Sequence, residues 1–141
     1  MTISSMFNNL IQLLDEKNYQ TDIWENSKFK NIKQLSCDEI GYLGEELIYN
    51  VCKEVNIPVT WDKNKNTIKK GQHDPKTFDM KIFDKLIEIK TATLGKNNNY
   101  QHENLCNDQT CDYWFFIDIS PYDIHLTILK KFNLKEKHHI L

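Results

Sequence analysis

Three charged residues in the middle of the chain are of the types that hydrolyse a phosphodiester. Asp79 precedes a Glu-x-Lys sequence formed by Glu88 and Lys90. Two carboxylates at one point offer oxygen ligands to a hard cation such as Mg²⁺ or Mn²⁺. A metal-bound water loses its proton readily, and a lysine beside it can position that water or stabilise the charge on phosphorus. These residues therefore predict metal-dependent phosphodiester hydrolysis if the fold brings them together.

A tight β-hairpin would place these side chains on one face. With a two-residue turn at residues 84–85, Asp79 faces Lys90 and Lys81 faces Glu88. Alternation along each strand leaves an apolar set for the other face, namely Phe78, Met80, Ile82, Ile87 and Ile89. The same pattern also fits an exposed hairpin that carries only cross-strand ion pairs.

The strongest helix signal lies upstream of the hairpin. Ser36 and Glu39 have the spacing of a capping box, and apolar residues then recur at helical intervals. The helical phase places Glu45 at the edge of the apolar stripe and Glu46 on the polar side. Gly41 leaves room one turn before Glu45, where a phosphate or metal could approach. The alternative for Glu45 is an ordinary carboxylate on the flank of a helix.

The order of these motifs resembles the PD-(D/E)xK nuclease superfamily, which includes type II restriction endonucleases, Holliday-junction resolvases and repair nucleases. The matching segments are residues 41–48, 78–79 and 87–93. An aromatic-Gln pair at residues 100–101 and an Asp-Tyr pair at residues 112–113 are similar to the region after the lysine in restriction-like members. The resemblance covers most of the chain.

The resemblance implies a role for each matching residue. It implies a metal site built from four positions, Glu45, Asp79, Glu88 and the main-chain carbonyl of Ile89. Lys90 would be the catalytic lysine, and Gln101 would lie near the scissile phosphate. The cofactor would be Mg²⁺, with Mn²⁺ as a substitute. The chain departs from the family pattern because no proline directly precedes Asp79.

The pattern predicts an α/β fold with a restriction-endonuclease-like core, in which helices flank a central mixed β-sheet. The nuclease core would span residues 36–141, and residues 1–35 would form a helical arm packed on the core or on a partner. Within the core we expect a helix beginning near residue 101. A central strand over residues 113–119 and a half-buried strand over residues 124–128 should come after it.

The composition is ordinary for a globular domain, with 40% hydrophobic and 27% charged residues in a chain of 141. No apolar run is long enough to span a membrane, and the first residues do not read as a signal peptide. We therefore expect a cytoplasmic protein with no membrane partner. The four cysteines are expected to be free thiols in that compartment.

Lysines gather around the hairpin although the formal net charge of the chain is −2. Residues 62–96 contain nine lysines and five acidic residues, so this segment is suited to meet the phosphates of DNA. We expect DNA contacts from four residues, Lys69, Lys70, Lys96 and His102. A solvated lysine loop is the alternative. The chain has no arginine, which leaves any base reading to Lys, Asn and Gln.

The residues and the resemblance together predict a Mg²⁺-dependent DNA endonuclease, most simply of the restriction type. Because one active site cuts one strand, a chain of this size would act as a homodimer or as a small catalytic subunit beside a larger recognition subunit. Two alternatives stay open. One is a structure-selective nuclease of the Holliday-junction resolvase kind, and the other is a catalytically silent DNA-binding module on the same fold.

Overall fold

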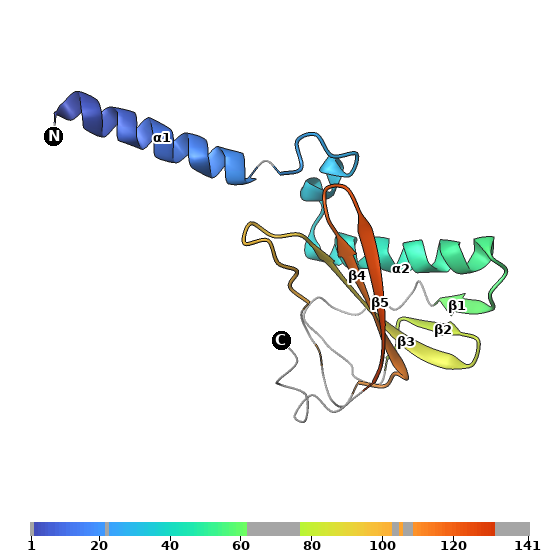
Figure 1. Ribbon diagram of the computed structural model, residues 1–141. Coiled ribbons are helices and arrows are strands. Elements are labelled where there is room, and N and C mark those ends of the chain that lie inside the picture. Colours follow the sequence, from blue (N-terminus) through green and yellow to red (C-terminus); the bar gives the residue numbers. More distant parts are fainter. Residues whose placement is uncertain (1, 22, 62–76, 103–104, 106–108, 132–141) are drawn as a thin grey trace.

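The fold is built on a five-stranded mixed β-sheet with the order β1-β2-β3-β4-β5 (Figure 1). The computed structural model describes residues 2–21, 23–61, 77–102, 105 and 109–131, with side chains for all of these but residues 15–21. The strands are β1 (Val59–Trp61), β2 (Met80–Ile82), β3 (Lys85–Thr93), β4 (Tyr113–Ile119) and β5 (Ile124–Lys130). β3 and β4 are parallel, and the other neighbours are antiparallel. The predicted α/β class with a mixed sheet is therefore confirmed.

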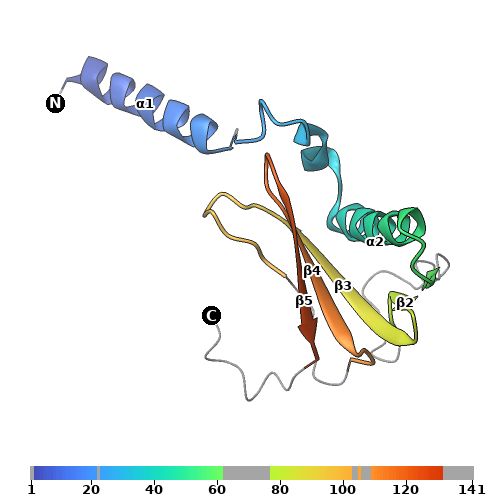
Figure 2. The same ribbon diagram turned by 45° about the vertical axis from the view of Figure 1, so that its right-hand side comes forward.

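The predicted capping box opens the main helix, α2 (Cys37–Glu54). The Ser36 hydroxyl accepts a hydrogen bond from the Glu39 N–H at 3.2 Å, and the Glu39 carboxylate accepts one from the Ser36 N–H at 3.1 Å. These two bonds satisfy N–H groups that the first turn of a helix otherwise leaves without partners. α2 lies across one face of the sheet, where it packs against β1 and β3 (Figure 2).

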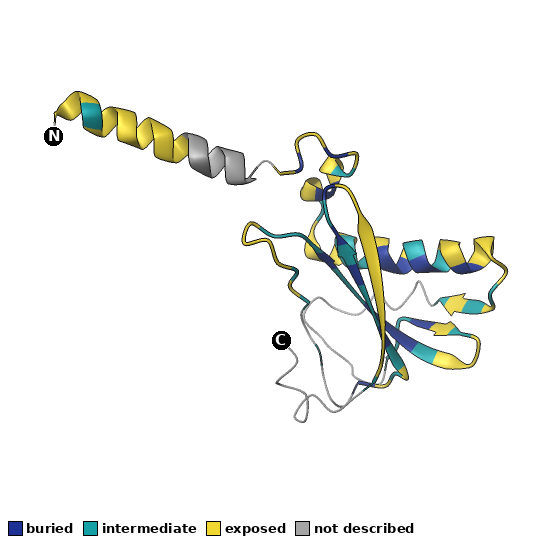
Figure 3. Ribbon diagram, in the orientation of Figure 1, coloured by how far each residue is buried: buried dark blue, intermediate teal, exposed yellow. Residues whose placement is uncertain are grey.

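The hydrophobic core fills the space between α2 and this face of the sheet. Ile48 and Cys52 of α2 join a buried cluster with residues from three strands, Met80, Ile87, Ile89, Ile117 and Ile119. Figure 3 shows the buried residues along the side of α2 that faces the sheet. The segment before α2, which contains the 3₁₀ helix η1 (Lys30–Gln34), adds Trp24 and Ile32 to the same cluster. The buried Ser27 hydroxyl also donates a hydrogen bond to the Pro121 carbonyl.

Gly44 allows α2 to approach the sheet closely. A methyl group at this position would collide with the Thr91 hydroxyl and would lie 3.0 Å from Thr91 Cβ and 3.2 Å from Ile117 Cδ1. At Gly41, one turn earlier, an added methyl group would meet no atom within 4 Å. The open space predicted at Gly41 is therefore present, whereas Gly44 is required for helix–sheet packing.

We expect Gly44→Ala to lower the free energy of unfolding by about 1–3 kcal/mol, because overpacking forces Thr91 and Ile117 to shift. Gly41→Ala is the matched control, and it should raise stability by up to about 1 kcal/mol through helix propensity alone. Urea unfolding monitored by circular dichroism measures both. Equal effects of the two substitutions would contradict the packing that the structure shows.

The N-terminal helix α1 (Ile3–Thr21) extends away from the sheet (Figures 1 and 2). Seven of its large apolar side chains are exposed, namely Ile3, Met6, Phe7, Leu10, Ile11, Leu13 and Leu14. A surface of this kind marks a contact region, and the packing of this arm on the core or on a partner stays a prediction. Within the described residues, neither α1 nor α2 has the length and apolar character that a bilayer span requires.

The hairpin between β2 and β3 forms, but its turn lies one residue earlier than predicted. Residues 83–84 make the turn, so that Met80 pairs with Ile87 and Lys81 pairs with Leu86. The predicted pairing, with Lys81 opposite Glu88, is therefore wrong by two residues. Because side chains alternate with a period of two, this shift leaves the side chains of the paired strands on their predicted faces.

Contacts of Phe83 account for the position of this turn. Phe83 adopts a φ of 54°, which a tight hairpin turn requires at its first central residue. Its N–H donates to the Pro58 carbonyl at 2.9 Å, which ties the turn to the start of β1. The paired part of β2 begins at Met80, so Asp79 lies just before it and is not opposite Lys90 as predicted.

Three further predictions need correction. The helix expected near residue 101 is absent from the described part of that region, where residues 100–102, 105 and 109–111 are not helical. The sequence also predicts helices that flank the sheet, yet among the described residues only α2 is seen to cover a face of it. β4 is central as predicted, but β5 is exposed along its whole length instead of half-buried.

Candidate active site

β3 presents two different surfaces on its two faces. Thr91 lies under Gly44 of α2, and Ile87 and Ile89 share that face because alternate residues point the same way. Glu88 and Lys90 therefore face the other side of the sheet. The parallel pairing with β4 places Trp114 beside Glu88 and Phe116 beside Lys90. The predicted acidic and basic residues of β3 thus lie together on the face that α2 does not cover.

Asp79 lies where β2 stops pairing with β3. Its N–H donates to the Ile87 carbonyl at 3.0 Å, and its Oδ2 accepts a hydrogen bond from the Ile89 N–H at 2.6 Å. The Asp79 carboxylate thus satisfies a main-chain N–H of β3 that a neighbouring strand would otherwise bind. The N–H and C=O of one strand residue point to the same side of the strand, so the Ile89 carbonyl shares this edge with Asp79. Two of the predicted metal ligands therefore come together here.

Glu88 is buried and held on both carboxylate oxygens. Its exposed fraction is 6%, its Oε1 lies 3.1 Å from Lys90 Nζ, and its Oε2 accepts a hydrogen bond from Gln109 Nε2 at 3.2 Å. A buried carboxylate is costly unless it is paired and hydrogen-bonded. The cross-strand ion pair expected between Lys81 and Glu88 is replaced by a pair of Glu88 with Lys90, which lies two residues along the same strand.

Gln109 is a site residue that sequence reasoning missed. It is 2% exposed, and its Nε2 donates to the Thr77 carbonyl at 2.7 Å as well as to Glu88. Its main-chain carbonyl accepts a hydrogen bond from Lys131 Nζ. Its side-chain partners lie more than 20 positions away in sequence, and no motif surrounds it. No local signal could therefore have identified it.

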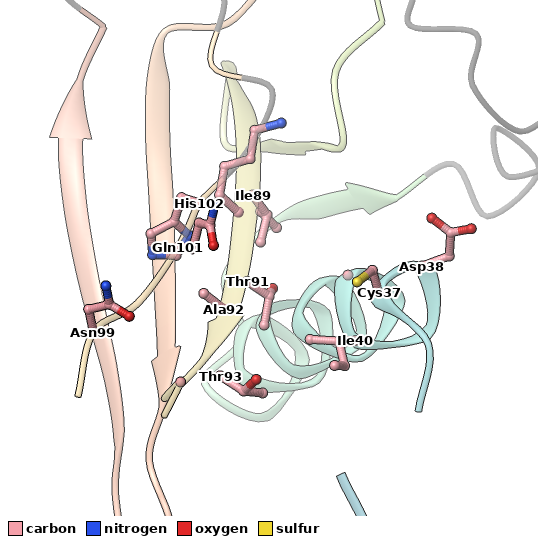
Figure 4. Close-up of a pocket in the computed structure, with 13 residues that line it drawn as sticks. Cys37, Asp38, Ile40, Ile89, Thr91, Ala92, Thr93, Asn99, Gln101 and His102 are labelled. Atoms are coloured by element: carbon pink, nitrogen blue, oxygen red, sulfur yellow. The ribbon is translucent and has the colours of Figure 1, made fainter. Parts of the chain in front are cut away.

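A pocket of about 490 Å³ opens beside Lys90. Its lining comes from three places, the first turn of α2, β3 from Ile89 to Thr93, and the segment from Gly95 to His102. Figure 4 shows Thr91 and Thr93 between α2 and the segment that carries Asn99, Gln101 and His102. The pocket therefore unites the predicted catalytic Lys90 with Gln101 and His102, which lie more than ten residues later in the chain.

His102 is held in place by an acidic partner that was not predicted. Its Nε2 lies 2.6 Å from Asp118 Oδ1, and its ring meets the edge of Phe116 with 4.9 Å between the ring centres. Because Phe116 and Asp118 face the same side of the sheet as Lys90, this contact fixes the end of the pocket segment against β4. The predicted contact of His102 with DNA stays a prediction.

The helical phase predicted for the two glutamates of α2 is confirmed. Glu45 is 6% exposed and Glu46 is exposed. Glu45 lies on the α2 side of the sheet, whereas Glu88 faces the other side. In the described part of the chain, no three His, Cys, Asp or Glu side chains gather closely enough to hold a metal ion. The structure therefore does not bring Glu45 together with Asp79 and Glu88.

The other predicted DNA-binding residues are distributed over different parts of the chain. Lys69 and Lys70 lie outside the described residues. Lys96 is exposed in the loop after β3, and Gln101 is exposed at the pocket. The contribution of these residues to DNA binding stays a prediction.

The residues at the hairpin fit a hard divalent cation without a third carboxylate. Mg²⁺ usually takes one or two protein carboxylates and fills its other positions with water and substrate phosphate. Asp79, Glu88 and the Ile89 carbonyl offer oxygen ligands of that kind. A carboxylate oxygen has more than one acceptor position, so the bonds to Gln109 and Lys90 do not exclude a metal.

Burial and the negative charge of Glu88 affect the pKa of the Cys111 thiol. Burial of the thiol, followed by the negative charge of Glu88, raises the pKa of Cys111 to about 11. Burial also raises the pKa of Cys52, whereas Cys37 is exposed on the first turn of α2. These three cysteines are free thiols, as predicted.

We expect iodoacetamide to label Cys37 much faster than Cys111 at a pH of about 7.5, because only the thiolate reacts. The labelling rate of Cys111 should then rise about tenfold per pH unit until the pH approaches its pKa of about 11. Peptide mapping by mass spectrometry gives the rate at each cysteine. Equally fast labelling of Cys111 and Cys37 at neutral pH would contradict the buried environment.

Comparison with known proteins does not assign the chain to a family. No family model matches the sequence, no curated protein matches it, and no solved structure matches the fold. The function must therefore be inferred from the residues and the geometry of the chain itself.

Proposed function

We propose that the chain is a Mg²⁺-dependent DNA endonuclease with a restriction-endonuclease-like core. The observation that supports this best is the convergence of Asp79, Glu88 and Lys90 at the point where β2 leaves β3. Asp79 is hydrogen-bonded to Ile87 and Ile89, the two residues that flank Glu88, and Lys90 Nζ lies 3.1 Å from the Glu88 carboxylate. A pocket lined by Ile89 and Lys90 opens next to these residues, and a substrate phosphate would enter there.

Each residue of this site has a task in the proposed reaction. Asp79, Glu88 and the Ile89 carbonyl would hold the cation, which when bound supplies an activated water and shields charge on the phosphate. Lys90 would donate to a phosphate oxygen and stabilise the negative charge that develops there. Hydrolysis forms a bond from the water oxygen to phosphorus and breaks the bond to the 3′ oxygen. The products are a 5′-phosphate and a 3′-hydroxyl, as the resemblance implies.

Beside the carboxylates of Asp79 and Glu88, Lys90 supplies the cation that would meet a phosphate of a nucleic acid. Lys90 is 14% exposed in its side chain, so its charge is only weakly screened by water. Gln101 is exposed in the lining of the same pocket and Lys96 is exposed in the loop after β3, and both would contact the DNA backbone. The chain would act as a homodimer or beside a larger recognition subunit, because one site cuts one strand.

The proposal is tested with two end-labelled substrates, a linear duplex and a four-way junction, incubated with Mg²⁺. We expect cleavage of the duplex into products that carry a 5′-phosphate, and loss of cleavage in Glu88→Gln. Cleavage of the junction alone would favour the resolvase kind of nuclease. Metal-independent binding without cleavage of either substrate would contradict the proposal and favour a silent DNA-binding module.

A further inference from the structure

The orientation of the Gln109 amide is determined by its two partners. Its Nε2 lies 2.7 Å from the Thr77 carbonyl and 3.2 Å from Glu88 Oε2. Both partners are acceptors, so the NH₂ group must point toward them and the amide oxygen away from them. The buried amide therefore acts as a double donor between the segment before β2 and the carboxylate on β3.

The hydrogen bond from Gln109 limits the positions that the Glu88 carboxylate can adopt. Lys90 holds Oε1 at 3.1 Å, and Gln109 holds Oε2 at 3.2 Å. Without the second bond, the flexible glutamate would be free to turn toward Lys90, the cation two residues along its own strand. Two different partners on the two oxygens thus fix both the position and the rotation of the carboxylate.

Hydrogen bonds join the segment that carries Gln109 to Lys131, just after β5, and to the start of β3. Lys131 Nζ donates to the Gln109 carbonyl, and the Lys131 N–H donates to the Asp112 carbonyl at 3.0 Å. Asp112 Oδ2 accepts a hydrogen bond from the Leu86 N–H at 2.8 Å, at the start of β3. Gln109 is therefore held by the same strand whose carboxylate it orients.

The amide oxygen of Gln109 is a second and independent indication that a water or an ion binds beside Glu88. Oε1 is buried and has no hydrogen-bond partner among the described residues. Buried polar atoms without a partner are rare, and a water or ion often satisfies them. An acceptor beside Glu88 is suited to a water that accompanies a bound cation.

We propose that Gln109 is a positioning residue that holds Glu88 in the orientation required to bind the divalent cation. This inference rests on the proposed function, because it assumes that Glu88 is a metal ligand. Groups that orient metal ligands typically change metal affinity by about 10–100-fold when they are removed. The role of Gln109 should therefore be visible in metal binding itself, before any cleavage takes place.

The test is the affinity for Mn²⁺, measured by electron paramagnetic resonance on the full chain without DNA. Gln109→Met keeps a side chain of similar length but removes the donor, and we expect it to weaken Mn²⁺ binding by about 10–100-fold. Cleavage by this variant should recover toward the wild-type rate at saturating Mn²⁺, which a general structural defect would not allow. Thr110→Ala, at an exposed neighbouring position, is the matched control and should bind Mn²⁺ as the wild type does.

The outcomes separate this inference from the proposed function. If Glu88→Gln binds Mn²⁺ as tightly as the wild type, the assignment of Glu88 as a metal ligand is wrong, and both proposals fail. If only Glu88→Gln loses Mn²⁺ and a folded Gln109→Met retains it, the role of Gln109 alone is overturned. If Gln109→Met does not fold, Gln109→Asn replaces it, because the shorter amide no longer reaches Glu88 and should give the same loss. Unchanged affinity in folded Gln109→Asn would likewise overturn the role.

Discussion

Replacing Lys90 with alanine should lower the rate of DNA cleavage by about 10²–10⁴-fold while the fold and DNA binding are retained. Lys90 Nζ lies 3.1 Å from Glu88 and lines the pocket at the open edge of β3. In the proposed reaction the ammonium group would stabilise charge that develops on the phosphate. Binding of DNA spreads over many phosphate contacts and depends less on one lysine. Single-turnover cleavage and a mobility-shift assay measure the two effects separately.

Two control variants make the result for Lys90 specific. Lys85→Ala removes an exposed lysine from the same strand and should leave cleavage nearly unchanged. Lys90→Arg keeps a positive charge beside Glu88 but changes its shape and hydration, and we expect it to preserve stability without restoring full activity. Wild-type cleavage by a folded Lys90→Ala variant would remove Lys90 from the mechanism.

If the proposed metal site is correct, a divalent cation should stabilise the wild type, and replacing Asp79 with asparagine should abolish that stabilisation. At a cation concentration of about 100 times the dissociation constant, binding adds about 2.7 kcal/mol to the free energy of unfolding. For a domain of this size, that corresponds to a rise in melting temperature of about 10 °C. The asparagine amide keeps an oxygen that accepts the Ile89 N–H bond, so the substitution removes mainly the charge that a metal needs.

Asp84 in the hairpin turn provides the control for Asp79. It is exposed and lies in the turn at the far end of β2, away from the site. Asp84→Asn should show the full metal-dependent rise in melting temperature, measured by differential scanning fluorimetry with Mg²⁺ and with EDTA. An equal rise in Asp79→Asn would show that the cation binds elsewhere.

Local sequence signals predicted the elements that depend on neighbouring residues. The capping box of Ser36 and Glu39 indicated the start of α2, and the spacing of apolar residues indicated which face Glu45 and Glu46 occupy. The apolar run of β4 indicated its central place in the sheet. These predictions were correct because the interactions that determine each element join residues a few positions apart in the chain.

Local sequence signals did not predict the register of the hairpin correctly. The sequence offers two neighbouring two-residue turns, and the choice between them depends on Phe83, whose N–H bonds to Pro58 just before another strand. The face of each side chain in the paired strands was nevertheless correct, because the error of two residues equals the period of a strand. Asp79 stays close to Glu88 despite the different register, because it is hydrogen-bonded to Ile87 and Ile89 on either side of that residue.

In the segment between β3 and β4, tertiary contacts determine a structure that the local sequence pattern does not predict. The sequence predicts a helix near Gln101, but His102 bonds to Asp118 and Gln109 bonds to Glu88. These contacts join residues 16 and 21 positions apart in the chain. No periodicity or motif in the sequence encodes them, so neither Asp118 nor Gln109 could be assigned to the site beforehand.

We propose that Asp79, Glu88 and Lys90 form one metal-dependent nuclease site. The most direct test of this claim is the conversion of supercoiled plasmid by the wild type with Mg²⁺ or Mn²⁺ against EDTA, with Glu88→Ala as the control. We predict metal-dependent conversion to linear fragments by a dimer, or to open circles by a chain that cuts one strand, and no conversion by Glu88→Ala. Equal conversion by wild type and Glu88→Ala, or conversion that persists in EDTA, would contradict the claim.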